Sequence, residues 1–137
     1  MEEKKSKAVK ELLLESFENL PEDIRKCEHN VLGFSNAIST TESEMKEQEY
    51  FTMAAISREK DITMVNDERI EKKKYTNDVG RNAELNKRLA KHKEYIENRK
   101  VINETKNLLA KEKIYLNYLN NKFSACKHIT KLLDVKE

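Results

Sequence analysis

Apolar side chains recur every three or four residues along most of the chain, and this periodicity restricts the fold more than any other feature. In the first half, one seven-residue repeat joins Ile24, Val31, Ile38 and Met45. In the second half, a similar repeat joins Ile102, Leu109, Leu116 and Phe123. A heptad repeat of this length is typical of a coiled-coil face rather than of a helix in a globular core. The sequence therefore predicts an all-α protein.

The scarcity of turn-forming residues supports a helical fold. The 137 residues include two glycines, Gly33 and Gly80, and one proline, Pro21. A β-rich fold would normally need many more turn residues than this, whereas long helices need few. Charged residues make up 38% of the chain and hydrophobic ones 37%. This balance predicts a large surface relative to the core, as in a rod.

Three helical segments are predicted within a single domain that spans residues 1–137. The first covers residues 6–20 and ends before Pro21, because proline suits the first turn of a following helix. The second covers residues 22–74 and the third residues 78–134. The turn between the long segments is expected at residues 75–81. There, Thr76 or Asn77 can cap the third helix, with Asp78 in its first turn.

The two long segments are expected to form an antiparallel helical hairpin, because they are similar in length and their connection is short. Folding about residue 77 would place Val31 near Phe123 and Cys27 near Cys126. The short N-terminal helix would pack at the open end of this hairpin. The apolar stripe is wider than two helices need, at Val101, Leu108, Tyr115 and Ile129, so a homo-oligomer is also expected.

The apolar face of the first segment and the aromatic residues of the third are the candidate protein-binding residues. The predicted contacts are Val9, Leu12, Leu13, Phe17, Tyr115 and Phe123.

Basic residues concentrate around the predicted turn and suggest an alternative, direct binding of nucleic acid. The net charge of the chain is +2, but residues 68–100 contain eleven Lys/Arg against six Asp/Glu. A positive hairpin tip would attract phosphates or an acidic protein. The candidate residues are Lys72, Lys73, Lys74, Arg81, Lys87, Arg88 and Lys91. The simpler interpretation is that these side chains keep the end of a helical arm hydrated.

No combination of residues predicts catalysis, a cofactor or a metal, so the chain is not expected to be an enzyme. Two glycines cannot build a glycine-rich phosphate loop, and no nucleophile lies beside a recognisable base. Cys27 and Cys126 are expected to be small buried apolar groups. A disulfide between them, or a zinc site completed by His29 and His128, is the alternative.

No membrane span and no secretory signal are expected. No run of roughly 18 apolar residues occurs, and the first residues lack the apolar block of a signal peptide. A cytoplasmic location is therefore predicted.

Residues 75–125 have a recognisable cadence. It begins at Tyr75-Thr76-Asn77-Asp78 and Arg81, and continues through Glu84-Leu85, Lys87-Arg88-Leu89 and Tyr95. This stretch resembles small coiled-coil proteins encoded in the early, replication and recombination regions of phages of Gram-positive bacteria. Gly80 departs from the cadence, where a charged helix former would be expected.

The resemblance implies an accessory protein of phage DNA metabolism, or one that counters a host defence, acting in the host cytoplasm. It supplies no catalytic residues. The predicted function is therefore a non-enzymatic coiled-coil protein that binds a DNA-processing or host-defence protein. Direct nucleic-acid binding through the basic tip is one alternative, and a structural coiled-coil subunit of a larger complex is the other.

Overall fold

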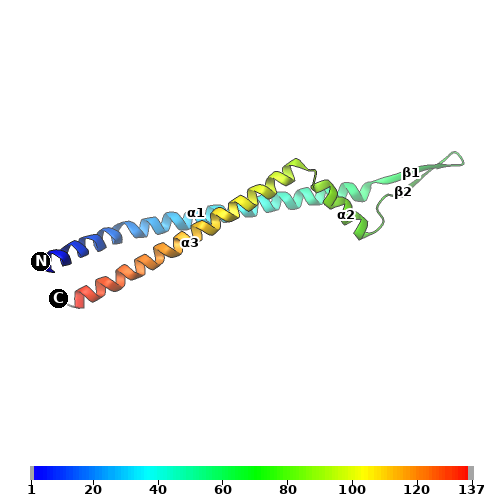
Figure 1. Cartoon of the computed structure of the whole chain (residues 1–137). Coiled ribbons are helices and arrows are strands. Elements are labelled where there is room, and N and C mark those ends of the chain that lie inside the picture. Colours follow the sequence, from blue (N-terminus) through cyan, green and yellow to red (C-terminus); the bar gives the residue numbers. More distant parts are fainter. Residues whose placement is uncertain (1, 136–137) are drawn as a thin grey trace. The chain divides into compact units, whose positions relative to one another are not determined.

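The computed structural model describes the backbone of residues 2–135 and the side chains of residues 7–133. In this part of the chain, the elements in order are α1 (Glu2–Arg58), β1 (Lys60–Val65), β2 (Glu68–Lys73), α2 (Asp78–Leu89) and α3 (Lys93–Val135). Figure 1 shows the long helices α1 and α3. The predicted all-α class is confirmed, because long helices that pack against each other dominate the fold.

The chain divides into two compact units, and α1 and α3 each contribute to both. Unit 1 contains Met1–Asn36 and Lys106–Glu137, and unit 2 contains Ala37–Thr105. The expectation of a single domain stays a prediction.

The core of unit 1 lies between the first part of α1 and the last part of α3. Its buried residues are Leu20, Cys27, Leu119 and Cys126, and side chains packed around them include Phe17 and Phe123. The rings of Phe17 and Phe123 meet edge to face, with centroids 5.5 Å apart. The thiol of Cys27 donates to the backbone carbonyl of Glu112 over 3.4 Å. The contact on α1 moves forward along the chain from Phe17 to Cys27, while its partner on α3 moves back from Phe123 to Glu112. The two helices are therefore antiparallel in unit 1.

The predicted pairing register between the helices is wrong by two heptads. Phe123 contacts Phe17, which lies 14 residues before the predicted neighbour Val31. Cys27 contacts Glu112, which lies 14 residues before the predicted neighbour Cys126. A slide by whole heptads keeps both apolar stripes in the seam, so periodicity alone does not distinguish these registers. Both thiols are free, so no disulfide joins Cys27 to Cys126.

The separate N-terminal helix over residues 6–20 is also wrong, because α1 continues through Pro21. A proline inside a helix removes a backbone hydrogen bond and costs roughly 3 kcal/mol. The apolar stripe explains why the helix continues. It runs without a change of phase across the proline, and its members pack in the core of unit 1: Leu13, Phe17, Leu20, Ile24 and Cys27. The Pro21 ring itself is exposed, where it does not interrupt this packing.

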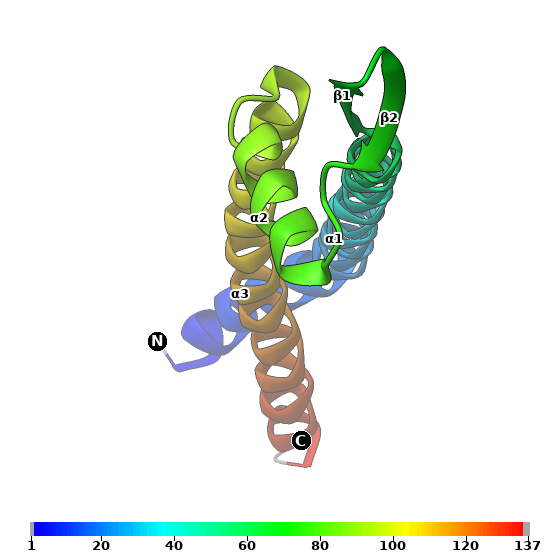
Figure 2. The same cartoon turned by 90° about the vertical axis from the view of Figure 1, so that its right-hand side faces the viewer.

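The predicted second helix, residues 22–74, ends instead at Arg58, and a β-hairpin follows it. β1 and β2 pair antiparallel through a two-residue loop, in which Asn66 and Asp67 have φ of 52° and 66°. Two-residue hairpin turns often need positive φ at both positions, and Asn and Asp tolerate it better than most residues. Figure 2 shows the resulting two-stranded ribbon. The sequence signal for β1 is the run Ile62-Thr63-Met64-Val65 directly before Asn66, in which three of the four residues are β-branched.

The predicted third helix, residues 78–134, begins where expected but is interrupted. Asn77 caps α2, and its side-chain oxygen accepts from the N–H of Gly80 over 2.7 Å. A Cβ atom at position 80 would lie 3.0 Å from that oxygen, which accounts for the glycine. The chain leaves the helix after Leu89, and His92 starts α3 by accepting from the N–H of Tyr95 through Nδ1. Residues 75–77 of the predicted turn therefore lead into α2, and residues 78–81 form the first turn of that helix.

Unit 2 also buries four apolar side chains, which are Ile38, Ile56, Leu89 and Ile102. Polar contacts join its stretch of α1 to the start of α3. The hydroxyl of Tyr95 donates to Glu49 over 2.8 Å, and the amide of Gln48 lies 3.5 Å from Glu94. Burial and the bond to Glu49 together raise the pKa of Tyr95. The neutral phenol is therefore the form that joins these helices.

Candidate protein-binding surface

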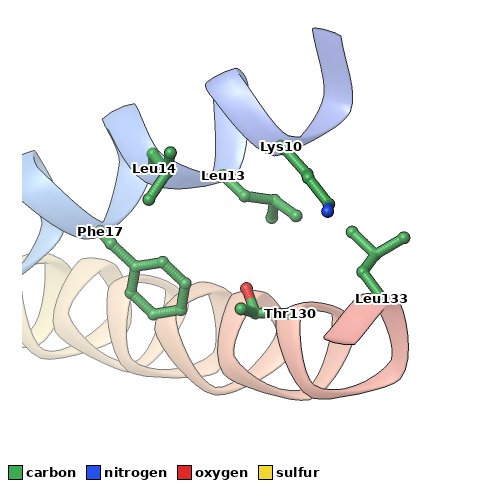
Figure 3. Close-up of a pocket in the computed structure, with 6 residues that line it drawn as sticks. All are labelled: Lys10, Leu13, Leu14, Phe17, Thr130 and Leu133. Atoms are coloured by element: carbon green, nitrogen blue, oxygen red, sulfur yellow. The ribbon is translucent and has the colours of Figure 1, made fainter. Parts of the chain in front are cut away.

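An apolar pocket lies between α1 and α3 in unit 1. Its volume is about 220 Å³, and Figure 3 shows the side chains that line it: Lys10, Leu13, Leu14, Phe17, Thr130 and Leu133. The four residues from α1 follow a three-and-four spacing, which places them on one side of that helix. The pocket therefore lies between one side of α1 and the end of α3, next to the core of unit 1, against which Leu13 and Phe17 pack.

Aliphatic side chains near this pocket remain exposed to solvent. The exposed fractions are 43% for Val9, 64% for Leu12 and 62% for Leu14 on α1. On α3 they are 42% for Ile129 and 51% for Leu132. Exposed leucines are ordinary when scattered singly, but Leu14 also lines the apolar pocket, and an exposed leucine at such a pocket is typical of a surface that binds another protein. We call these five residues and the pocket the apolar end of unit 1.

The candidate protein-binding residues divide into two sets. Val9 and Leu12 are exposed at the apolar end, and Leu13 and Phe17 line its pocket. Phe123 instead packs into the core, with the Lys127 ammonium 4.4 Å from its ring centroid. Tyr115 is half exposed and stacks on Tyr118, outside the pocket lining.

Leu14, Thr130 and Leu133 line the pocket, although they are not among the predicted protein-binding residues. Leu14 lies one position from the seam residue Leu13. The signal was its spacing of four from Lys10 and three from Phe17.

The candidate nucleic-acid residues lie on several elements and do not all have free charge. Lys72 and Lys73 belong to β2, whereas Arg81, Lys87 and Arg88 belong to α2. Arg81 pairs with Asp78 within the first turns of α2. The candidate nucleic-acid residues that are exposed to solvent are Lys72, Lys73, Lys74, Lys87 and Lys91. Within Lys60–Lys73, four basic residues are matched by four acidic ones, so the hairpin is not a strongly positive surface.

Arg88 holds α2 to the end of α1 rather than facing solvent. Its guanidinium donates to Glu84 over 2.9 Å and to Glu59 over 2.5 Å. The bond to Glu84, followed by the bond to Glu59, raises the pKa of Arg88 further above its ordinary value. The same contact to Arg88 lowers the pKa of Glu84. Arg88 is therefore a structural ion-pair residue of unit 2.

Replacing Arg88 with alanine should destabilise unit 2 by about 1 kcal/mol, because two partly exposed ion pairs are lost together. Hydrogen exchange of the α2 amides should become severalfold faster. Lys87→Ala is the matched control, because Lys87 is exposed on the same turn of the helix. Equal exchange rates in both variants would contradict this role for Arg88.

The potential zinc ligands do not assemble. Among the side chains that the structure describes, no three His, Cys, Asp or Glu residues gather closely enough to hold a metal ion. Cys27 and Cys126 lie in the core of unit 1, whereas His29 and His128 are exposed. The alternative grouping of Cys27, His29, Cys126 and His128 is therefore not formed.

Comparison with protein-family models, with curated protein sequences and with solved structures finds no match to this chain. Across the described residues, no helix has an apolar stretch long enough to cross a membrane. The site must therefore be interpreted from its own chemistry. That chemistry consists of an apolar pocket and exposed aliphatic side chains on two antiparallel helices.

Proposed function

We propose that this chain is a non-enzymatic binding protein that works by occupying a surface of another protein. The observation that carries the proposal is the apolar end of unit 1, where a pocket of about 220 Å³ is lined by Leu13, Leu14 and Phe17, and Leu14 is more than half exposed. A groove between two helices suits the apolar side chains of an amphipathic partner helix. The exposed aliphatic residues would lose their contact with water on binding.

The resemblance of residues 75–125 to early-region phage proteins guides the choice of partner. We infer that the partner is a DNA-processing or host-defence protein and that the chain acts in the host cytoplasm as an accessory or inhibitor protein. Direct nucleic-acid binding is less well supported, because Arg81 and Arg88 are ion-paired and the hairpin charges balance. A purely structural subunit would not need an open pocket on unit 1.

The test uses a tagged full-length chain expressed in a Gram-positive host that carries the phage genes. We expect stoichiometric recovery of one DNA-processing or defence protein. With the partner purified, Leu14→Glu should weaken its binding at least tenfold, which corresponds to about 1.4 kcal/mol. The cause is a carboxylate placed at the mouth of an apolar pocket. Leu14 is 62% exposed, so the substitution should leave the fold intact.

Leu32→Glu is the matched control, because Leu32 also lies on α1 in unit 1, is 57% exposed and is absent from the pocket lining. It should bind the partner like the unmodified chain. Recovery of no partner, or equal losses for both variants, would refute the proposed surface.

A further inference from the structure

The β-hairpin of unit 2 is exposed along both of its edges. Within the described chain, β1 and β2 are the whole sheet, so each strand has one edge without a hydrogen-bonding neighbour. All of β1 is exposed, including Ile62 at 54%, Met64 at 66% and Val65 at 48%. A two-stranded ribbon is only marginally stable by itself, and open edges are templates for pairing with another strand.

The free edge of β2 presents the backbone groups of alternate residues. The N–H of Lys74 donates to the carbonyl of Glu59 over 3.0 Å, at the base of the hairpin. In an antiparallel ladder, pairs that exchange backbone hydrogen bonds alternate with pairs that do not. When this alternation is followed from Lys74 along the register of the strands, Thr63 and Ile70 form one of the pairs that exchange backbone hydrogen bonds. It leaves the N–H and C=O groups of Arg69 and Glu71 directed away from β1.

The side-chain sequence of β2 is complementary to itself when it is reversed about Ile70. In an antiparallel pairing of two copies, Ile70 faces Ile70 of the second copy, and Arg69 faces Glu71 of the second copy. Glu68 likewise faces Lys72 of the second copy. By symmetry each pairing of opposite charges occurs twice. In this register, Arg69 lies opposite Glu71 of the second copy. The backbone N–H and C=O groups of both residues point outward from their own hairpins, so they can bond to each other across the new pairing.

We propose that a second copy of this chain pairs with the free edge of β2, so that the two hairpins form one four-stranded antiparallel sheet. The charge pairs fix the register and orientation of this sheet, whereas new backbone hydrogen bonds and the apolar contact at Ile70 provide the affinity. The edge of β1 does not have this property. Reversed about Ile62, β1 sets the charged Lys60 opposite Met64 and Asp61 opposite Thr63, without partners of opposite charge.

This inference does not rest on the proposed function, because the hairpin belongs to unit 2 and the apolar end belongs to unit 1. The two ideas can therefore fail separately. Leu14→Glu should leave self-association unchanged, whereas changes in β2 should abolish it.

The experiment measures the mass of the full-length chain by sedimentation equilibrium in low salt, at concentrations up to about 1 mM, a range that detects weak association. Glu68→Lys should weaken dimerisation at least tenfold, because it sets two lysines against each other at both symmetric positions. Lys72→Glu should have the same effect through paired carboxylates. This second variant is made together with Asp61→Asn, because Asp61 lies opposite Lys72 within the hairpin.

An equimolar mixture of the two variants is the decisive measurement. Each copy then offers the charges that the other lacks, so heterodimers should form with an affinity close to that of the original chain. Glu47→Lys, an exposed site on α1, is the matched control and should dimerise normally. The proposal is overturned if the original chain stays monomeric, if the single variants dimerise like the original, or if the mixture does not recover.

Discussion

Replacing Leu119 with alanine should lower the free energy of unfolding by about 3 kcal/mol, as expected for a leucine truncated in a close-packed core. Leu119 is 3% exposed and shares the core of unit 1 with Leu20, Cys27 and Cys126. The change removes apolar contacts and leaves a cavity that two rigid helices cannot fully close. Urea unfolding followed by far-ultraviolet circular dichroism measures the loss.

Leu108→Ala is the matched control for this prediction. Leu108 lies on the same helix but is 49% exposed, so its truncation should change the stability by about 0.5 kcal/mol or less. If the two variants unfold at the same urea concentration, Leu119 is not a core residue of unit 1.

The thiol of Cys27 should react with an alkylating reagent at pH 8 about two orders of magnitude more slowly in the native chain than in the urea-unfolded chain. Burial raises the pKa of Cys27 to about 11, and its hydrogen bond to the Glu112 carbonyl adds to this shift. The reactive thiolate is therefore scarce at pH 8. A Cys126→Ser background leaves Cys27 as the single thiol, and mass spectrometry follows its modification.

The same shift predicts how stability depends on pH. The fold favours the neutral thiol, so its contribution is fully present below the ordinary cysteine pKa of about 8.5. It is lost as the pH rises from there toward about 11, where the native thiol ionises. A Cys27→Ala variant should lack this alkaline loss. Native labelling as fast as labelling of the unfolded chain would show that Cys27 is not buried against α3.

Much of the helical structure could be predicted because it depends on local properties of the sequence. Helix periodicity identified residues that do pack against the core of unit 1, including Ile24, Leu116 and Phe123. Asn77 and Asp78 were placed correctly at the start of a helix, because capping requires only a side chain that reaches the first turn.

Pro21 and the β-hairpin could not be predicted by the same reasoning. Local preference favours a helix end at Pro21, but packing of the continuous stripe on both sides of the proline outweighs the lost hydrogen bond. At Lys60–Val65, the heptad repeat could be continued through Ile62, as in a helix. Only the positive φ values of Asn66 and Asp67 in the structure show that the chain reverses direction after this segment. The candidate pocket also depended on Leu133 and Thr130, which lie over 110 residues from Leu13.

The sequence by itself determined that the chain is helical, which faces of its helices are apolar, and where α2 begins, because these follow from spacing and capping within a few neighbouring residues. Only the tertiary structure decided the register of α1 against α3. Registers that differ by two heptads present equivalent stripes, so the choice depends on how particular side chains, such as Phe17 and Phe123, fit together. That choice also placed Thr130 and Leu133 of α3 beside Leu13 and Leu14 of α1, where together they line the pocket.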